Sequence, residues 1–417
     1  MKYIGLLDCN NFFVSCERVF RPDLKNVPTV VLSSNDGCVV ARSKEIKEMG
    51  VPMGVPYFKV KDELKKANAA VFSSNFPLYR DISSRVMEIL KEEAGFVEQY
   101  SVDEAFFALD MQEANVSGEL LRIKRAIETR VGIPVSVGAA KTKTIAKYAS
   151  EVGKKTTGTS VMCDSLWQEA TKTLLVSEIW GIGRQTSQKM KDLGIVTVSD
   201  LLAVDIARVD RLFGIGGLRL HDELSERSVH TLGGERSDQK SIMSTRSFKN
   251  TTTDRSVIED ALAYHVSHAA AELRAMKMKT TKMSVIAGTS RHGDWLLRGG
   301  SRDVILSSPT SDTRVLLKEA LKLLGSLYEE GVPYKKAGIV LGSFVSEDLE
   351  QGDLFISKDD DSKSSYVMHT IDVLNKRFGN ETITIGRKTS GTVWKSSREF
   401  VSPCYTTNWD EIATIKT

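Results

Sequence analysis

Three carboxylates lie beside apolar segments of the 417-residue chain, and this placement constrains its fold more than any other feature. Asp8 ends the apolar run at residues 4–7, and the pair Asp103 and Glu104 adjoins the run at residues 105–109. Apolar runs of this length are typical of buried strands. A charge next to a buried strand is costly unless it is paired or bound to a metal. We therefore expect these three carboxylates to be paired or to share cations.

Converging carboxylates repel one another, and a pair of hard divalent cations would relieve that repulsion. Such a site suits in-line phosphoryl or nucleotidyl transfer with two metals. The alternative is three solvated acids at strand ends, since acidic residues are common at protein surfaces. Because adjacent strand residues point to opposite faces, Asp103 and Glu104 can share a site only where the chain bends or at the end of a hairpin.

Charge and cysteine content narrow the class of protein. The formal net charge is only +3, which neither requires nor excludes a nucleic-acid partner. The five cysteines include no CxxC pair, which argues against a disulfide framework or a zinc site and fits a reducing compartment. No apolar run of about 18 residues exists, and the N-terminus lacks a signal-peptide pattern. We therefore expect a soluble, cytoplasmic chain without a membrane partner, with domains of about 100–200 residues.

Periodicity predicts an α/β or α+β sheet domain in the first part of the chain. Strands are expected at residues 2–7, 29–32, 106–109 and 135–139, and helices at 82–93 and 120–131. The chain then becomes helical and compact. Within this helical part, Ile179-Trp180-Gly181-Ile182-Gly183-Arg184 resembles a helix–hairpin–helix, whose glycines let backbone N–H groups approach a phosphate. The alternative for Gly181 and Gly183 is an ordinary turn between packed helices.

The hydrophobic periodicity of the second part of the chain predicts a small α+β domain, with two helices on an antiparallel sheet. The expected helices are 256–277 and 313–330, and the expected strands are 283–287, 303–305 and 337–341. The acidic stretch that follows, from residue 347 to residue 361, is expected to be flexible. The fold of the last segment, 366–417, is left open.

Several short sequence motifs occur in an order that closely resembles the catalytic core of Y-family DNA polymerases. They are the segment around Asp8, then Phe20-Arg21-Pro22-Asp23-Leu24, the segment 28–43, Gly50-Val51-Pro52-Met53-Gly54, and Tyr100-Ser101-Val102-Asp103-Glu104-Ala105-Phe106. The version Asn35-Asp36-Gly37-Cys38 is similar to the UmuC type, the catalytic subunit of bacterial DNA polymerase V and its relatives. The resemblance extends from the N-terminus to about residue 341.

The resemblance implies a multidomain α+β fold shaped as a right hand. The palm would comprise residues 1–28 and 78–170, and the small fingers domain residues 29–77. A helical thumb with the helix–hairpin–helix would span 171–232, followed by a linker at 233–242. A little-finger domain would span 243–345, and a C-terminal tail with a clamp-binding peptide would span 346–417.

The resemblance also implies the chemistry: a template-directed, error-prone translesion DNA polymerase of DNA repair and the SOS response, recruited to damaged DNA in the nucleoid. Asp8, Asp103 and Glu104 would be the catalytic, metal-binding carboxylates, with the backbone carbonyl of Cys9 as a further ligand. Two Mg²⁺ ions fit because all of these ligands are hard oxygens. One ion would activate the primer 3′-hydroxyl, and the other would hold the triphosphate.

Nucleotide-binding positions follow from the same resemblance. Phe13, five residues after Asp8, occupies the place of the aromatic steric gate against a ribose 2′-hydroxyl, with Phe12 beside it; the alternative for both rings is the core. The remaining residues expected around the triphosphate are Ala41, Arg42, Lys44, Lys47 and Lys154. Many relatives have Tyr and Arg where Lys44 and Lys47 fall, and Lys replaces a planar fork with a point charge.

A run of basic residues in the second part predicts a sheet face that follows DNA phosphates without reading sequence. Together with Gly181 and Gly183, the expected DNA contacts are Arg274, Lys279, Lys282, Arg291, Arg298 and Arg302. A merely solvated face is the alternative.

The motif Gln351-Gly352-Asp353-Leu354-Phe355 resembles a peptide that binds the bacterial sliding clamp. Gln351, Asp353, Leu354 and Phe355 are the candidate clamp contacts, and such peptides fill an apolar pocket from a flexible segment. The expected partners are primer–template DNA, dNTP and the sliding clamp, with a UmuD-like subunit and RecA as further candidates. Two other functions compete: a non-catalytic, clamp-recruited DNA-binding factor on a polymerase fold, and a two-metal nuclease.

Overall fold

A computed structural model describes residues 2–233, 239–290, 299–347, 358–379, 381–386, 394 and 398–413. The chain forms two compact units. Unit 1 comprises Met1–Arg236 and Glu399–Thr417, and unit 2 comprises Ser237–Arg398. The chain therefore leaves unit 1 once and returns to it near the C-terminus.

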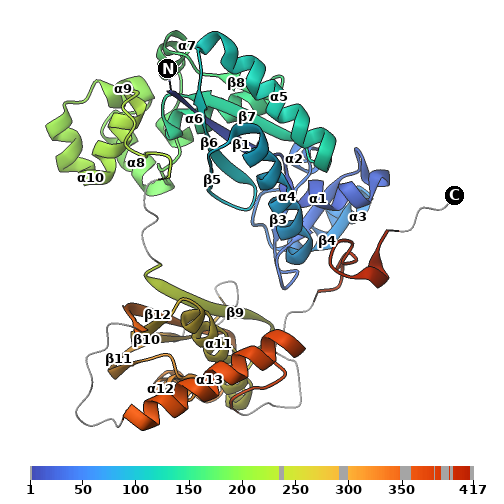
Figure 1. Cartoon of the computed structure of the whole chain (residues 1–417), viewed down its shortest axis with the longest axis vertical. Coiled ribbons are helices and arrows are strands. Elements are labelled where there is room, and N and C mark those ends of the chain that lie inside the picture. Colours follow the sequence, from blue (N-terminus) through green and yellow to red (C-terminus); the bar gives the residue numbers. More distant parts are fainter. Residues whose placement is uncertain are drawn as a thin grey trace. The chain divides into compact units, whose positions relative to one another are not determined.

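The main sheet of unit 1 has the strand order β5-β6-β1-β7-β8 (Figure 1). Its strands are β1 (Lys2–Cys9), β5 (Val97–Gln99), β6 (Glu104–Asp110), β7 (Val135–Ala140) and β8 (Thr159–Val161). The central strand β1 pairs antiparallel with both β6 and β7. The four strands expected in this half of the chain, at 2–7, 29–32, 106–109 and 135–139, are all present.

Alternating side chains of the sheet face two different helix layers. Tyr3, Leu7 and Phe107 pack into the core formed with α4 (Phe76–Ala94) and α5 (Glu113–Val131). Ile4, Leu6 and Phe106 pack into the core formed with α6 (Lys143–Lys155). The period of two along a strand separates these sets, and it also directs Asp8 and Glu104 toward the α6 side.

A glycine brings α6 unusually close to the sheet. A Cβ added at Gly138 of β7 would lie 2.1 Å from the backbone nitrogen of Ser150 in α6, so no other residue fits there. This close approach places the side chains of α6 directly over the end of β1.

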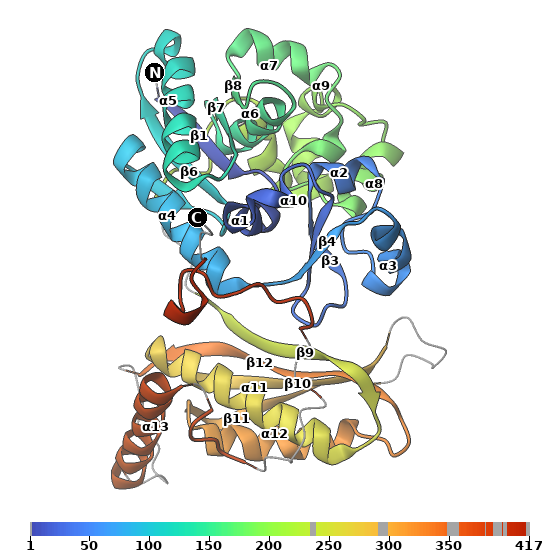
Figure 2. The ribbon, with the colours of Figure 1, turned by 90° about the vertical axis from the view of Figure 1, so that its right-hand side faces the viewer.

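A second, three-stranded sheet in unit 1 has the order β3-β2-β4. Its strands are β2 (Thr29–Leu32), β3 (Val39–Arg42) and β4 (Ala70–Ser73). Helices α1 (Phe12–Phe20), α2 (Lys44–Glu48) and α3 (Tyr57–Lys66) and the 3₁₀ turn Pro22–Leu24 accompany it. Figure 2 shows this sheet and α3 from a second side.

The helical part of unit 1 contains α7 (Asp164–Thr171), a 3₁₀ turn Val176–Glu178, α8 (Arg184–Asp192), α9 (Val198–Leu202) and α10 (Ile206–Leu224). Gly214 interrupts α10 with φ of 62°, a left-handed conformation that glycine adopts without strain. No helix among the described stretches of the chain is long and apolar enough to cross a membrane. The five cysteines, all described, are free.

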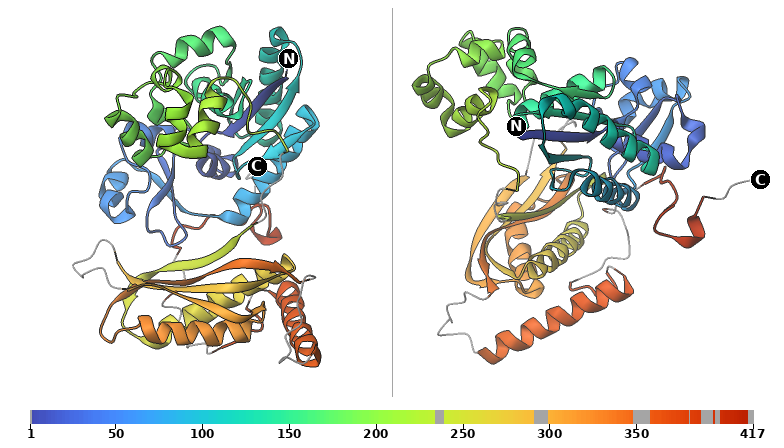
Figure 3. Two further views of the ribbon diagram at one scale, coloured as in Figure 1. Left: turned by 90° about the vertical axis from the view of Figure 1, so that its left-hand side faces the viewer. Right: turned by 45° about the horizontal axis from the view of Figure 1, so that its top comes forward.

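Unit 2 is a four-stranded antiparallel sheet with helices on one face (Figure 3). The strand order is β11-β10-β12-β9, formed by β9 (Ser241–Thr252), β10 (Met278–Thr289), β11 (Gly299–Thr310) and β12 (Tyr334–Ser346). The covering helices are α11 (Arg255–Ala275) and α12 (Thr313–Leu327). The two predicted helices and three predicted strands are present, and β9 was not predicted.

The tail differs from its sequence prediction. Helix α13 (Lys358–Phe378) includes residues 359–361, so the expectation of a flexible stretch is wrong there. The run of like charges opens a helix whose later residue Met368 is buried, and tertiary packing of that kind outweighs composition. A last 3₁₀ turn, Trp409–Glu411, lies in unit 1.

Candidate active site

Asp8 and Glu104 are direct cross-strand partners at the end of β1 and the start of β6. In an antiparallel pair, directly opposite residues point to the same face of the sheet. The two carboxylates are close enough to interact by hydrogen bonding, and Asp8 is only 8% exposed. Two acidic groups thus share a mostly buried position, which requires positive charge nearby.

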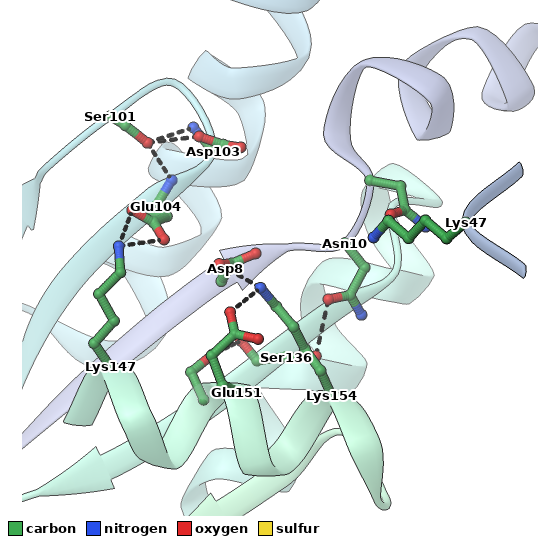
Figure 4. Close-up of polar contacts among 12 residues, drawn as sticks. Asp8, Asn10, Lys47, Ser101, Asp103, Glu104, Ser136, Lys147, Glu151 and Lys154 are labelled. Atoms are coloured by element: carbon green, nitrogen blue, oxygen red, sulfur yellow. Dashed lines mark hydrogen bonds and ion pairs between the residues drawn. The ribbon is translucent and has the colours of Figure 1, made fainter. Parts of the chain in front are cut away.

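Two lysines of α6 supply that charge (Figure 4). Lys147 Nζ donates to both carboxylate oxygens of Glu104, at 2.7 Å each. Lys154 Nζ donates to Asp8 Oδ2 at 2.7 Å and to Glu151 Oε1 at 2.7 Å. Lys147, Glu151 and Lys154 are spaced at i, i+4 and i+7, which places them on one helix face. The face of α6 next to the carboxylates is therefore a row of alternating charges.

The acidity of Asp8 reflects this environment. Burial raises the pKa of Asp8 to about 7, the Lys154 ammonium opposes the increase, and the neighbouring Glu104 adds to it. A buried carboxyl group with a raised pKa is stabilised when a cation replaces its proton.

Asp103 lies at the bend that connects β5 to β6, as a site shared with Glu104 requires. Ser101 Oγ donates to Asp103 Oδ1 at 2.6 Å and accepts the backbone N–H groups of Asp103 and Glu104, at 3.2 and 2.9 Å. The Asp103 carbonyl accepts the N–H of Cys9 at 2.9 Å, which ties the bend to β1. Figure 4 shows the Asp103 carboxylate turned toward Ser101 and away from Asp8.

The donor set fits a hard divalent cation in its chemistry. Asp8 and Glu104 offer carboxylate oxygens on one face, and Asp103 follows at the adjacent bend. Within the described ranges, no three His, Cys, Asp or Glu side chains are gathered as a metal-binding group. The carboxylates of Asp8 and Glu104 are instead paired with lysines, and that of Asp103 with a hydroxyl.

The two phenylalanines of α1 occupy different environments. Phe12 is 4% exposed and belongs to the core, so its side chain lies away from any open site. Phe13 is half-buried and stacks on Tyr79 of α4, with ring centroids 4.4 Å apart and an interplanar angle of 14°. Phe76 contacts Phe13 edge-on at 6.0 Å. Of the two rings, only Phe13 is available to a bound molecule.

Three of the predicted triphosphate ligands carry charges that lie close together. The pKa of Lys47 is lowered, first by partial burial and then by the nearby charges of Arg42 and Lys154. Lys47 Nζ donates to Asn11 Oδ1 at 2.6 Å, and Arg42 donates to the carbonyl of Val51. These three cations next to Asp8 suit an anion with several charges.

The other two predicted positions differ. Lys44 has an 81% exposed side chain that pairs with Glu48 at 3.7 Å, an ion pair of little energetic weight. Ala41 is buried in β3, so only its backbone can contact a ligand.

The glycine turn of the helical part opens α8. Gly181 has φ of 94°, which favours glycine, and Gly183 is the N-cap of α8. No side-chain hydrogen bond caps this helix start, and the first N–H groups of a helix lack a partner within the helix. Ile179 and Ile182 anchor the turn in the core.

The basic residues of unit 2 do not share one sheet face. Lys282 pairs with Ile305 on the face opposite α11 and α12, together with Ser284 and its partner Asp303. Arg302 of the edge strand β11 lies directly opposite Val285 of β10, whose side chain is buried against the helices. Arg302 therefore points to the helix-covered face of the sheet and not to the face that carries Lys282. The predicted single basic face is therefore wrong for Arg302.

Arg274 and Lys279 both have side chains that lie largely inside unit 2. Arg274 makes two 2.7 Å hydrogen bonds to Asp372 of α13 and donates to the Ser311 carbonyl at 2.6 Å. Lys279 is only 5% exposed. Neither side chain is therefore proposed as a DNA contact. Four clamp candidates and two basic residues lie outside the described residues: Gln351, Asp353, Leu354, Phe355, Arg291 and Arg298.

Several residues of the site were not singled out from the sequence. Glu151 shares the helical spacing of Lys147 and Lys154, and this periodicity could have revealed it. Lys336 of β12 lies on the face of the unit 2 sheet opposite α11 and α12, which we call the open face. It shares that face with Gly338, two residues further along the strand, whose partner on β10 is Ile286. Tyr79 carried no local signal, since its contact with Phe13 joins residues distant in sequence.

Three family models match the chain. The impB/mucB/samB family matches residues 7–151, its C-terminal domain matches 239–354, and a domain of unknown function matches 365–415. UmuC of Salmonella typhimurium is 35% identical over 430 residues, covering 99% of this chain and 100% of the relative. ImpB of the same organism is 33% identical, with 98% of each chain covered. DNA polymerase IV 1 of Bacillus subtilis is 29% identical, covering 94% of this chain and 96% of the relative.

Solved structures share the fold. A Y-family DNA polymerase chimera has a TM-score of 0.67 at 22% identity and covers 82% of this chain and 99% of its own. An insertion ternary complex of Dbh DNA polymerase has a TM-score of 0.53 at 23% identity, with the same coverage. The predicted multidomain α+β fold is confirmed by these likenesses. With end-to-end similarity to UmuC and ImpB, the chain belongs to the impB/mucB/samB family, the UmuC type of the Y-family DNA polymerases.

Proposed function

We propose that this chain is a template-directed, error-prone translesion DNA polymerase that adds dNTPs to a primer 3′-hydroxyl in DNA repair and the SOS response. The observation that carries the proposal is the pairing of Asp8 with Glu104 across β1 and β6, beside the cations of Arg42, Lys47 and Lys154. Acidic groups for metals next to cations for phosphates are what nucleotidyl transfer requires. Family membership supports the same activity.

The hand-like division gives each part a role. Palm residues 1–28 and 78–170 carry the carboxylates, and fingers residues 29–77 carry Arg42 and Lys47. Thumb residues 171–232 and little-finger residues 243–345 hold DNA in this proposal. The last two residues of the linker expected at 233–242 belong to β9. The tail at 346–417 carries the clamp peptide.

Asp8, Asp103 and Glu104, with the Cys9 carbonyl, would hold two Mg²⁺ ions. Bound there, the ions would lower the pKa of the primer hydroxyl and stabilise the leaving pyrophosphate. Lys154 and Lys147 neutralise Asp8 and Glu104 before the cations bind, which keeps the buried charges tolerable. The side chains of this chain therefore prepare the site without a ligand.

Lys154, Arg42 and Lys47 bind the triphosphate in this proposal. Lys154 exchanges its contact with Asp8 for a phosphate oxygen, and the like charges of the three groups explain why they need an anion. Phe13 excludes a ribose 2′-hydroxyl by shape, because its ring is held on Tyr79. Substrate selection is thus steric at the sugar and electrostatic at the phosphates.

DNA contacts are proposed at two places, one in each unit. The uncapped N-terminus of α8, opened by Gly181 and Gly183, presents N–H groups to a backbone phosphate. The open face of the sheet in unit 2 presents Lys282 and Lys336 for phosphates, without reading sequence. The bacterial sliding clamp is the proposed partner of Gln351, Asp353, Leu354 and Phe355, and a UmuD-like subunit and RecA are further proposed partners.

Primer extension tests the proposal. The full chain, a primed template, the four dNTPs and Mg²⁺ should yield extended primer. Glu104→Gln, which keeps the shape and removes the charge, should abolish extension while DNA binding stays near the wild-type level. Binding without extension by the wild type would favour the non-catalytic factor, and shortening of the primer would favour a nuclease.

A further inference from the structure

A short C-terminal segment, residues 399–405, returns to unit 1 and packs against it; we name it the C-terminal strap. Its path is drawn in red in Figure 1. Ser73 N–H at the end of β4 donates to the Phe400 carbonyl at 2.9 Å, and Phe400 N–H donates to Ser73 Oγ at 3.0 Å. Tyr405 stacks on Phe20 of α1, with centroids 4.6 Å apart and planes within 6°. The strap thus joins the three-stranded sheet to α1.

The centre of the strap enters a buried polar cluster. Ser402 is 5% exposed, and its Oγ donates to Glu17 Oε1 at 3.1 Å. Glu17 lies in α1 and is 0% exposed. Asn75 Nδ2 donates to Ser402 Oγ at 3.0 Å and to the Pro403 carbonyl at 3.2 Å, while its Oδ1 caps α4. A buried carboxyl group thus depends on a residue 385 positions away in the sequence.

The same carboxyl group connects the strap to the candidate sugar gate. Tyr79 OH donates to Glu17 Oε1 at 2.6 Å, so one oxygen accepts from both Ser402 and Tyr79. The other oxygen, Oε2, has no hydrogen-bond partner within the described residues. The Tyr79 ring is 1% exposed and stacks on the half-buried ring of Phe13. A chain of direct contacts therefore runs from the strap to Phe13.

We propose that the C-terminal strap helps to set the sugar selectivity of the active site. Ser402 positions Glu17, Glu17 fixes the Tyr79 hydroxyl, and the Tyr79 ring holds Phe13 in place. Ser402, Glu17 and Tyr79 are positioning residues in this scheme, and Phe13 alone meets the nucleotide. The inference rests on the proposed function of Phe13 as a steric gate.

The physical reason is the small number of partners at Glu17. Without the Ser402 hydroxyl, the carboxyl group keeps one hydrogen bond and is left under-satisfied in a buried position. It then gains by rotating or by admitting water, and either change weakens its hold on Tyr79. Because an aromatic stack is sensitive to displacement of one ring, Phe13 becomes less restrained and more tolerant of a 2′-hydroxyl.

The test compares full-length variants by the ratio of kcat/KM for a dNTP over the matching rNTP. Ser402→Ala should lower this ratio roughly twofold to tenfold, the effect of one buried hydrogen bond. Tyr79→Phe should lower it similarly. The double variant should lose less than the two single losses combined, because both act through Glu17. Glu17→Gln keeps the accepting oxygen and should retain a ratio near wild type.

Two controls separate selectivity from stability. Trp409→Ala changes an 89% exposed residue beyond the strap and should leave the ratio unchanged. Hydrogen exchange of the α1 amides should speed up in Ser402→Ala and not in Trp409→Ala, a readout that needs no catalysis.

The outcomes assign failure to one idea or the other. If Ser402→Ala lowers the melting temperature while the ratio stays at the wild-type value, the strap only stabilises the fold and the inference is overturned. An unchanged rate of α1 exchange in Ser402→Ala would overturn it as well. Absence of primer extension by the wild type would instead defeat the proposed function, and the exchange measurement would still report on the strap.

Discussion

Lys147 Nζ donates two 2.7 Å hydrogen bonds to the Glu104 carboxylate. The same ammonium group lies 5.3 Å from the ring centre of Tyr100 and 5.7 Å from that of Trp180. The aromatic rings and the carboxylate together hold the cation in one position. The pairing therefore orients Glu104, and orientation of a proposed metal ligand by a neighbouring group affects activity.

Lys147→Ala should lower kcat for nucleotide addition roughly tenfold to a hundredfold, the usual cost of losing an orienting partner. Lys147→Arg should recover part of the loss, since it keeps the charge and the ring contacts. Single-turnover extension on a primed template measures the effect. Lys155→Ala, at the exposed end of the same helix, is the matched control. Equal activity of Lys147→Ala and wild type would show that Glu104 needs no support.

Binding of a divalent cation should depend on pH through Asp8. Burial raises the pKa of this carboxyl group to about 7. Its proton must leave before a cation binds, so affinity should fall about tenfold per pH unit below 7 and level off above it. The electron paramagnetic resonance signal of free Mn²⁺, recorded from about pH 5.5 to about pH 8.5 without nucleotide, measures the affinity of the site for the cation.

Lys154→Met provides the control for this pH dependence. The Lys154 ammonium lowers the pKa of Asp8, so its removal should move the break in the affinity profile to higher pH. A flat profile in the wild type would mean that Asp8 does not bind the ion.

Phe13→Ala should increase ribonucleotide incorporation more than it lowers deoxynucleotide incorporation. The ring is half-buried and supported from behind by Tyr79, so its removal opens space at the sugar position. Steady-state incorporation of matched rNTP and dNTP gives the two efficiencies. Phe12→Leu is the comparison, since Phe12 lies in the core and should affect stability more than selectivity. An unchanged preference in Phe13→Ala would move the gate to another residue.

Local patterns account for most of what could be predicted. The apolar run before Asp8 and the bend at Asp103 are local features, and so is the periodicity of α5 and α11. The pairing of Lys147 with Glu104 depends on how α6 lies over β1, which Gly138 permits by its lack of a side chain. The contact of Ser402 with Glu17 spans 385 positions and leaves no local signal. Arg302 was misplaced because a one-residue change in register moves a side chain to the other face.

The clamp peptide remains a prediction from sequence. Replacing Leu354 and Phe355 with Ala should weaken binding to the sliding clamp at least roughly tenfold, because each buried apolar side chain contributes about 1.5–3 kcal/mol. Activity on a short primer without the clamp should not change. Clamp titration together with a thermal melt of each protein measures both effects. Unchanged clamp affinity with a lower melting temperature would identify these residues as an anchor on the protein itself.

Arg274 and Lys282 provide a matched pair that separates folding from DNA binding. The Arg274 side chain is 15% exposed and paired with Asp372, so Arg274→Ala should destabilise unit 2 by about 1–3 kcal/mol. Lys282 is 47% exposed on the open sheet face, where its pair with Asp303 contributes little. Lys282→Ala should leave the melting temperature unchanged and reduce by about one the slope of log affinity for DNA against log salt. Thermal melts and salt titrations of both variants decide the matter. If Arg274→Ala changed the salt slope and kept the melting temperature, Arg274 would be a phosphate contact after all.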